Sequence, residues 1–401
     1  MRITTGMMYD RSLSSLMKSN ERLSKATDQA NTLEKFTTAG ESPTGMAQKL
    51  NLTAEIAKYK QYASNGTNVQ GKLTQEESVL DSLNTAMGSA YTKVQQIVNG
   101  TNNSTDDREA LASELEELQK HMLDLMNSRD DSGEYLFSGS QSKTPAFALD
   151  SSGQYQYQGD SGQRFGQVSQ TVKIATSDPG DSVFQNVPTA RTASSSTMSS
   201  ISVGDNSAFS SFYASHYDPA NSANNTFTVA TVAGSPDTYQ IKDAGGNVLQ
   251  SGNYTQGDEI SFNGLKLNPG VASGSSTSFA LDAPSSDNVL NSLGKMIAAL
   301  RDPTQTTDQI NTLAASTQVH LSNSQNSVNQ TIGTVGARLS SLDAITNSNT
   351  NLSGISQDKK AEVSEVDLYE AITNLTKENN ALDMARKSYA MINKSTLFDY
   401  L

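Results

Sequence analysis

Three histidines are the first residues of this chain whose side chains could hold a metal ion or move protons. They are His121, His216 and His320. A helical zinc site needs two such residues three or four positions apart, and none of the three has a partner at that spacing. Isolated histidines usually pack in a core or lie on a surface. The sequence therefore predicts no histidine-based metal centre.

An acidic loop and several serines are the other candidates for chemistry. Residues 128–134 have the composition of a calcium loop, but Arg129 occupies a ligand position and Gly133 is displaced from the turn position. The Ser-x-x-Lys pattern that begins at residues 15, 140 and 356 is expected by chance in a Ser-rich chain, and the companion motifs of a serine acylase are missing. We therefore expect no enzyme activity, no cofactor, no metal and no small-molecule substrate.

Composition and charge limit the partners. The 401 residues include 29 Lys+Arg, 42 Asp+Glu and no Cys, with a formal net charge of -13. Phosphate binding needs clustered basic residues, so we expect neither nucleic acid nor an anionic membrane as a partner. No apolar stretch approaches the roughly 18 residues of a membrane span, and residues 1–20 lack the apolar region of a secretory signal peptide. The chain is thus expected to stay in the cytoplasm or to leave by a route that reads no such signal.

The elements that position these residues are long helices in the two outer parts of the chain. Apolar residues in 44–99 repeat every seven residues, with a second row three positions later, and 286–345 repeats the pattern. Such a heptad pattern is typical of helices that pack as coiled coils. A short turn after residue 99 and a capping Ser104 or Thr105 predict a second helix that folds back on the first. The main seam residues are Leu73, Leu80, Met87, Val94, Leu111, Leu115, Met122, Leu321, Val328, Val335 and Leu342.

The middle of the chain has a different pattern. Gly and Pro are concentrated in 139–285, where apolar and polar residues alternate in short runs. Asn263-Gly264 between two apolar runs predicts a hairpin with a type I′ turn, and 243–247 predicts another hairpin. Residues 189–225, rich in Ser, Ala and Asn, are predicted to be a loop or an insertion. The middle is therefore predicted to be a β-rich insertion whose two ends lie close together.

These patterns predict an α+β multidomain chain, in which both ends form a long antiparallel helical bundle or coiled coil around an inserted β-rich middle domain. Residues 1–43 are an N-terminal helical assembly segment and 44–138 the N-terminal half of the bundle. Residues 139–285 form the β-rich inserted domain, 286–358 the C-terminal half of the bundle, and 359–401 a C-terminal helical assembly segment.

The two terminal segments carry apolar stripes that nothing in the sequence is expected to cover. The stripe in 1–40 is too thin to order a long helix alone, and the fuller one in the last forty residues would invite association if exposed. We expect both segments to be disordered in the monomer and to fold against copies of themselves or relatives. The residues expected at this assembly interface are Ile3, Met7, Leu13, Leu16, Leu23, Leu33, Leu368, Ile372, Leu375, Leu382, Tyr389, Ile392, Leu397 and Phe398.

Short blocks of sequence resemble a known family. They include the opening Met1–Tyr9, the Gly-Glu-Tyr-Leu-Phe-Ser-Gly block at 133–139, the Asp-Leu-Tyr-Glu-Ala-Ile-Thr run at 367–373 and the Leu-Phe-Asp-Tyr-Leu ending at 397–401. In these blocks the chain is similar to the flagellin-like axial proteins of bacterial flagella, and within them to the hook–filament junction proteins. The resemblance covers both ends fully and the middle in patches.

The resemblance implies a secreted structural protein of the bacterial flagellum. Subunits would be exported unfolded through the flagellar type III pathway without a cleaved signal peptide and would assemble outside the cell. The implied partners are hook-associated protein 1, flagellin and copies of the chain itself, with a flagellar export chaperone on the C-terminal helix beforehand.

Two other functions remain open at this point. The chain could be a flagellin that builds the filament itself, although the ending at 397–401 argues against this. Alternatively, the β-rich middle could serve as an adhesin or glycan-binding module in addition to a joining role.

Overall fold

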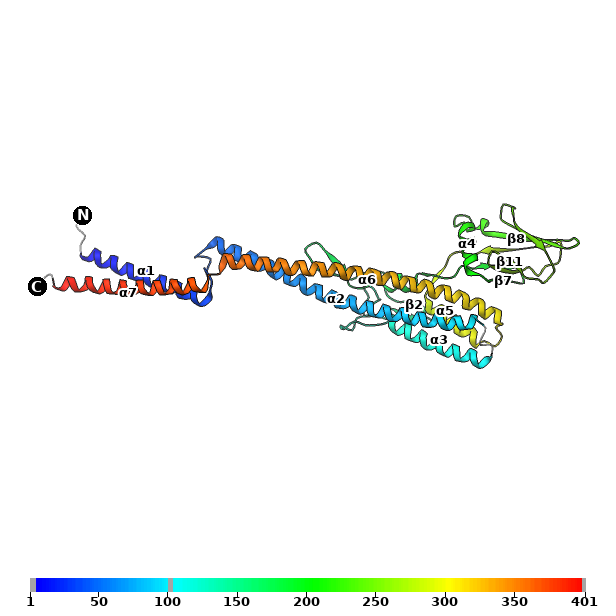
Figure 1. Cartoon of the computed structure of the whole chain (residues 1–401), viewed down its shortest axis with the longest axis horizontal. Helices are drawn as coiled ribbons and strands as arrows, with labels where there is room; N and C mark the ends of the chain where they lie inside the picture. Colours follow the sequence, from blue (N-terminus) through cyan, green and yellow to red (C-terminus); the bar gives the residue numbers. More distant parts are fainter. Residues whose placement is uncertain (1–4, 100–103, 399–401) are drawn as a thin grey trace. The chain divides into compact units, whose positions relative to one another are not determined.

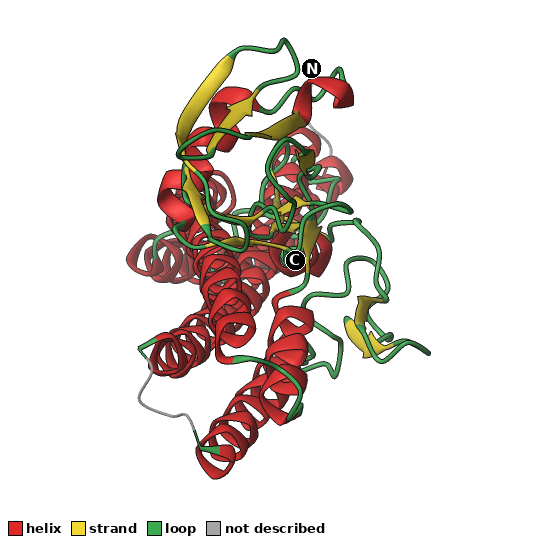
Figure 2. Cartoon of the chain, turned by 90° about the vertical axis from the view of Figure 1, so that its right-hand side faces the viewer, coloured by secondary structure: helices red, strands yellow, loops and turns green. Residues whose placement is uncertain are grey.

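The structure, a computed structural model, describes residues 5–99 and 104–398, with described side chains at 6–99 and 104–391. Figure 2 shows that helices dominate it and that the strands form smaller groups. The helices are α1 (Thr5–Thr32), α2 (Pro43–Val98), α3 (Thr105–Met126), α4 (Asn206–His216), α5 (Val289–Arg301), α6 (Thr307–Ser364) and α7 (Leu368–Phe398) (Figure 1).

The chain divides into two compact units. The first comprises Met1–Thr67, Gln167–Val172 and Leu342–Leu401, and the second comprises Asn68–Gly166 and Lys173–Ser341. The first unit thus holds α1, α7 and the adjoining parts of α2 and α6. The second holds the remaining parts of α2 and α6 with α3, α5 and all of the middle region except the short segment that belongs to the first.

The second unit contains a helical bundle whose core is the predicted heptad seam. Leu73, Leu80, Met87 and Val94 of α2 are fully buried, as are Leu321, Val328 and Val335 of α6. Burial of aliphatic side chains of this size contributes about 1.5–3 kcal/mol each. The bundle is thus held together mainly by the residues that the seven-residue repeat indicates.

Helix α3 begins where its capping residue predicts. The Ser104 side chain accepts a hydrogen bond from the Asp107 backbone N–H, so the predicted cap is confirmed. The helix packs along α5, where Gln119 Nε2 donates to the Leu290 carbonyl at 2.7 Å. Arg301 adds ion pairs to Glu109 and Glu116 at 3.1 and 2.9 Å.

Helix α6 is longer than the sequence pattern indicates. The Ser/Asn-rich stretch 346–356 continues as helix, so the expected boundary between 358 and 359 lies inside α6. Ser353 and Ser356 are buried within the first unit, where small side chains allow close helix packing. Thr350 donates to the Thr346 carbonyl at 2.9 Å, which satisfies its hydroxyl without leaving the helix.

The middle region has two parts. Residues 139–186 form small hairpins and a single π-turn, η1 (Asp181–Gln185). Paired strands β5 and β14 then bracket a larger insertion, with Ser286 opposite Pro188 and Asp287 opposite Val187. The strands of the first part and of this neck are β1 (Phe147–Leu149), β2 (Tyr155–Tyr157), β3 (Phe165–Gln167), β4 (Lys173–Ala175), β5 (Val187–Pro188) and β14 (Ser286–Asp287).

The insertion contains a five-stranded antiparallel sheet of order β10-β9-β8-β13-β6 and a three-stranded sheet of order β11-β12-β7. Aromatic and aliphatic side chains from both sheets and from α4 share one core. The strands are β6 (Ala193–Ser194), β7 (Ser200–Val203), β8 (Thr226–Val232), β9 (Thr238–Lys242), β10 (Val248–Asn253), β11 (Ile260–Phe262), β12 (Leu265–Asn268) and β13 (Ser276–Leu281); a 3₁₀ turn, η2 (Ser222–Asn225), precedes β8.

Both predicted hairpins are present. Phe262 pairs with Leu265, and Asn263 and Gly264 between them have φ values of 45° and 84°, as a type I′ turn requires. At the other hairpin the Asp243 N–H donates to the Asn247 carbonyl at 3.0 Å, which joins β9 to β10.

The prediction of a loop over 189–225 is wrong in part. This stretch contains β6, β7 and α4, and α4 is capped by Asp205, whose side chain accepts from the backbone N–H groups of Ser207 and Ala208. Phe209, Phe212 and Tyr213 then fall on one buried face of the helix. A cap followed by aromatic residues at helical spacing is the signal that the Ser- and Ala-rich composition conceals.

Candidate assembly surface

Helices α1 and α7 pack along each other within the first unit. Ser19 and Ala26 of α1 and Ala371 and Leu382 of α7 are buried in this pair. Small residues allow the two backbones to approach closely, and Leu382 supplies the largest fully covered side chain. The apolar contact between the helices is therefore narrow for their length.

Two polar contacts fix the register of the pair. The Tyr389 hydroxyl donates to the Tyr9 hydroxyl at 2.7 Å, and the ring centroids lie 5.5 Å apart. This hydrogen bond raises the pKa of Tyr9. Arg22 forms an ion pair with Glu378 at 3.4 Å. Tyr9 near the start of α1 pairs with Tyr389 of α7, whereas Arg22, further along α1, pairs with the earlier residue Glu378, so the helices are antiparallel.

The ends of the pair meet the rest of the unit through two crossing segments. The Lys35 N–H donates to the Ser364 carbonyl at 2.7 Å, and the Val366 N–H donates to the Leu33 carbonyl at 2.9 Å. Leu33 ends α1 with φ of 57°, a left-handed conformation that costs a leucine about 1–2 kcal/mol. Phe36 then packs over Gly45, where a Cβ would lie 2.7 Å from the ring.

The structure separates the expected assembly residues into two groups. Leu382 is buried, and Leu13, Leu16, Leu23, Leu375 and Tyr389 are half-buried between α1 and α7. Met7, Leu33, Leu368 and Ile372 are exposed. Ile3 lies outside the described residues, as do the side chains of Ile392, Leu397 and Phe398, whose backbone belongs to α7. The heptad seam is thus largely the contact within the pair.

Further apolar side chains of the pair are exposed, and the heptad pattern does not predict them. Met8, Tyr9 and Met17 on α1 and Tyr369, Met384 and Met391 on α7 are all exposed, Tyr369 by 82%. Their signal in the sequence is the spacing of Met384 and Met391, which are seven residues apart but off the seam. Together with Met7, Leu33, Leu368 and Ile372, these residues form the exposed apolar surface of the pair.

The candidates for metal chemistry have ordinary packing roles. His216 stacks on Phe212 with ring centroids 4.4 Å apart, and buried His320 bonds Ser292 Oγ at 2.6 Å and the Asp287 carbonyl at 3.1 Å. Burial lowers the pKa of His320. In the former calcium-loop candidate, Asp130 pairs with Lys72 at 2.8 Å. No group of three His, Cys, Asp or Glu residues that could hold a metal is present in the described part of the chain.

A buried acidic cluster lies in the second unit. Glu76 of α2 is completely buried, and its Oε1 accepts from the Asp178 N–H at 2.8 Å. Asp178 in turn forms a two-pronged ion pair with Arg338 of α6, both distances being 2.8 Å. Burial, and next the charge of Asp178, raise the pKa of Glu76 to about 8. The cluster ties the segment after β4 to two helices of the bundle.

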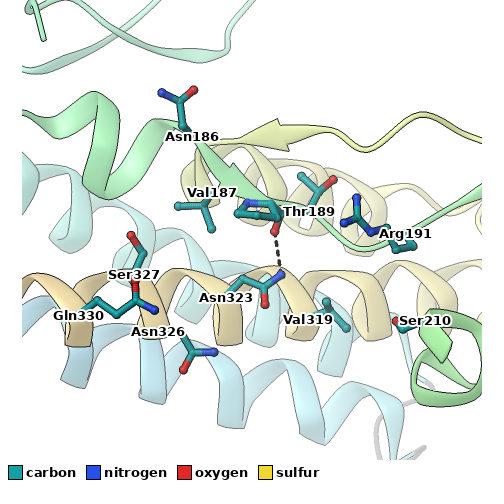
Figure 3. A pocket seen from close by; sticks show the side chains of 11 residues that line it. Asn186, Val187, Thr189, Arg191, Ser210, Val319, Asn323, Asn326, Ser327 and Gln330 are labelled. Carbon is teal, nitrogen blue, oxygen red and sulfur yellow. Dashed lines mark hydrogen bonds between the residues drawn. The ribbon is translucent and has the colours of Figure 1, made fainter. Parts of the chain in front are cut away.

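The cavity of about 560 Å³ beside β5 and α6 is polar and open (Figure 3). Asn323 of α6 donates to the Pro188 carbonyl at 2.8 Å across it. Figure 3 shows Asn186 and Asn326 pointing in opposite directions, away from a common centre. The lining residues include neither an aromatic ring nor a carboxylate, so the cavity brings no catalytic set together.

Comparison with known proteins gives relatives of one kind. The bacterial flagellin N-terminal helical region matches residues 3–142. Flagellar hook-associated protein 3 of Salmonella typhimurium is 30% identical over 187 residues, covering 47% of this chain and 58% of that protein. The Escherichia coli protein of the same name is 29% identical over the same share. The chain therefore matches less than two thirds of the length of these curated relatives.

Solved structures show the same fold. The Xanthomonas campestris FlgL structure is 25% identical with a TM-score of 0.58, covering 76% of this chain and 98% of that one. Hook-associated protein 3 of Legionella pneumophila, at 23% identity, has a TM-score of 0.60 and covers 78% and 98%. The resemblance to the flagellin-like proteins is confirmed. Helical ends around a β-rich middle, which the sequence patterns predict, are the observed architecture.

No helix among the described residues is long and apolar enough to cross a membrane.

Proposed function

We propose that this chain is a structural subunit of the bacterial flagellum that forms the junction between the hook and the flagellin filament. The observation that carries the proposal is the exposed apolar surface of the α1–α7 pair, in a chain similar to flagellar hook-associated protein 3. A joining protein needs surfaces that are incomplete until neighbours cover them. The role is structural and needs no catalytic residues.

The mechanism is coupled folding and assembly. Ordering a backbone costs about 1–2 kcal/mol per residue. The narrow contact within the α1–α7 pair offsets little of this, because large side chains such as Met384 and Tyr369 stay outside it. Each of them contributes about 1.5–3 kcal/mol once a neighbour covers it. Residues 1–43 and 359–401 are accordingly disordered in the monomer and ordered in the assembly.

The partners follow from the position of a junction. Hook-associated protein 1 lies on the hook side, flagellin lies on the filament side, and copies of the chain lie beside one another. Head-to-tail contacts that do not close generate helical assemblies, which suits a tubular structure. Before assembly the chain leaves the cell through the flagellar type III pathway, with an export chaperone on its C-terminal helix, and it acts outside the cell.

A strain that lacks this chain tests the proposal. Electron microscopy is expected to show hooks without filaments, and the medium is expected to contain shed flagellin. Return of the intact chain restores the filaments. Filaments of normal length on the hooks of the deletion strain would overturn the proposal.

The same experiment separates the junction role from that of a filament subunit. If the chain were the filament subunit itself, the deletion would remove the filament protein from the medium as well as from the cell surface. Shed flagellin of a different sequence is the outcome that the junction role requires.

A further inference from the structure

Nine methionines of this chain differ sharply in exposure between the bundle and the terminal helix pair. Met87, Met122, Met126 and Met296 lie in the bundle core and are completely buried. By contrast, the methionines of the terminal helix pair are exposed: Met7 by 62%, Met8 by 47%, Met17 by 61%, Met384 by 72% and Met391 by 73%. We call these five residues the methionine set. They are five of the ten residues that define the exposed apolar surface.

The members of the set lie at two levels of the paired helices. The contacts Tyr9–Tyr389 and Arg22–Glu378 fix the antiparallel register. In that register Met8 lies level with Met391, and Met17 lies level with Met384. The five thioethers therefore lie at two levels of the pair, about 10–14 Å apart along the helices, and all of them are exposed.

The chemistry of the thioether makes this arrangement consequential. Methionine is flexible and polarizable, so it adapts to unlike neighbours, but an exposed thioether is also readily oxidised. In the reaction with hydrogen peroxide, a sulfur lone pair attacks one peroxide oxygen and the O–O bond breaks. One oxygen remains on the sulfur as a sulfoxide and the other leaves as water. The apolar side chain has become polar.

We propose that the methionine set is an oxidation site that controls assembly: a peroxide converts it to sulfoxides in the free subunit, and the oxidised subunit no longer joins its neighbours. This inference rests on the proposed function. The buried methionines of the bundle are protected by the same fold, so oxidation leaves the rest of the chain intact. Reduction by the two sulfoxide reductases, one for each epimer, restores assembly: a dithiol supplies two electrons and two protons and becomes a disulfide, and the sulfoxide oxygen leaves as water.

The test uses the purified full chain treated with hydrogen peroxide. Peptide mass spectrometry is expected to find one added oxygen on each member of the methionine set and none on Met87, Met122, Met126 and Met296. The treated chain is then offered to isolated hooks from the deletion strain, followed by flagellin, and filaments are counted by electron microscopy. At a fixed concentration of the chain, oxidation is expected to lower the number of filaments on the order of tenfold or more.

A chain in which all five methionines are replaced by leucine is the matched control. Leucine has nearly the same volume and does not react, so this variant is expected to assemble before and after peroxide. Equal assembly of oxidised and untreated wild-type chain would overturn the inference while leaving the junction role standing. Loss of assembly by the peroxide-treated leucine variant would also overturn it, because the sensitive group would then lie elsewhere. Failure of the untreated chain to restore filaments would instead contradict the proposed function.

Discussion

Leu382 and the residues around it show how one helix serves two contacts. Leu382 is buried between α7 and α1, whereas Met384, about 200° further around the helix, is exposed. A seven-residue repeat finds the first kind of residue, because it reports the narrow seam. It does not find the second, since Met384 and Met391, although seven residues apart, lie off the seam that the repeat follows. The apolar residues that α1 and α7 leave exposed are therefore only partly predictable from the sequence.

Leu382→Asp tests the inner contact. A carboxylate placed in this buried position costs the paired state roughly 3 kcal/mol or more, so junction formation is expected to be lost. The urea unfolding midpoint of the bundle is expected to be unchanged, because Leu382 belongs to the first unit and the bundle core belongs to the second. Leu149→Asp, at an exposed leucine of β1, is the matched control and is expected to affect neither property. A lower midpoint in Leu382→Asp would contradict the separation of the terminal pair from the bundle.

Glu76 gives a pH dependence of known sign. Its pKa is about 8 in the folded state against a usual 4.5, so the folded chain binds more protons than the unfolded chain between these values. The free energy of unfolding therefore falls as pH rises through this window. Glu76→Gln cannot ionise and keeps an oxygen for the Asp178 N–H. The free energy of unfolding of this variant relative to wild type is expected to be about 1–4 kcal/mol higher at pH 9 than at pH 5.

Urea unfolding of both chains across this pH range checks the prediction. The charges that face Glu76 are Asp178, Arg338 and Arg164, and all three are unchanged in the variant. Parallel stability curves for the two chains would show that Glu76 is not held neutral in the fold.

At the scale of elements, local repeating patterns predict the secondary structure reliably. Features that depend on packing against other segments are not predicted. The heptads of α2 and α6 and the Asn263-Gly264 turn are local patterns with one physical solution each. Helix α4 was missed because its aromatic face depends on two sheets far away in sequence. The continuity of α6 through 346–356 was missed because buried serines look polar in the sequence and become acceptable only against a neighbouring helix.

The neck formed by β5 and β14 makes the insertion separable. The Thr189 N–H donates to the Ser285 carbonyl at 2.9 Å, so the chain leaves and returns at one place. Replacement of 190–284 by a short Gly/Ser linker is expected to leave the helical bundle folded, because the insertion has its own core. Circular dichroism and the unfolding midpoint check the fold, and filament counts check the joining role.

The same deletion addresses the adhesin alternative. If the chain serves only as a junction, cells with this deletion are expected to keep their filaments and their attachment to surfaces. Normal filaments with lost attachment would show that the insertion carries a binding role of its own, and lost filaments would show that it takes part in the joint.

At the scale of the whole molecule, the chain contains two kinds of helix packing. The bundle of the second unit buries its heptad core within one chain, whereas the terminal pair of the first unit leaves Met384, Met391 and Tyr369 exposed. The first kind of packing is complete within one chain, and we propose that neighbours complete the second. Sequence alone predicted the two helical ends, but only the structure separates the side chains that face each other from those that face outward.

Hydrogen exchange of the backbone amides of α1 and α7, measured in the free chain and in the assembled junction, tests this claim most directly. We expect exchange within seconds in the free chain, strong protection in the assembly, and protection of the α2 and α6 seam in both. Equal protection of α1 and α7 in the free and assembled chain would contradict coupled folding and assembly.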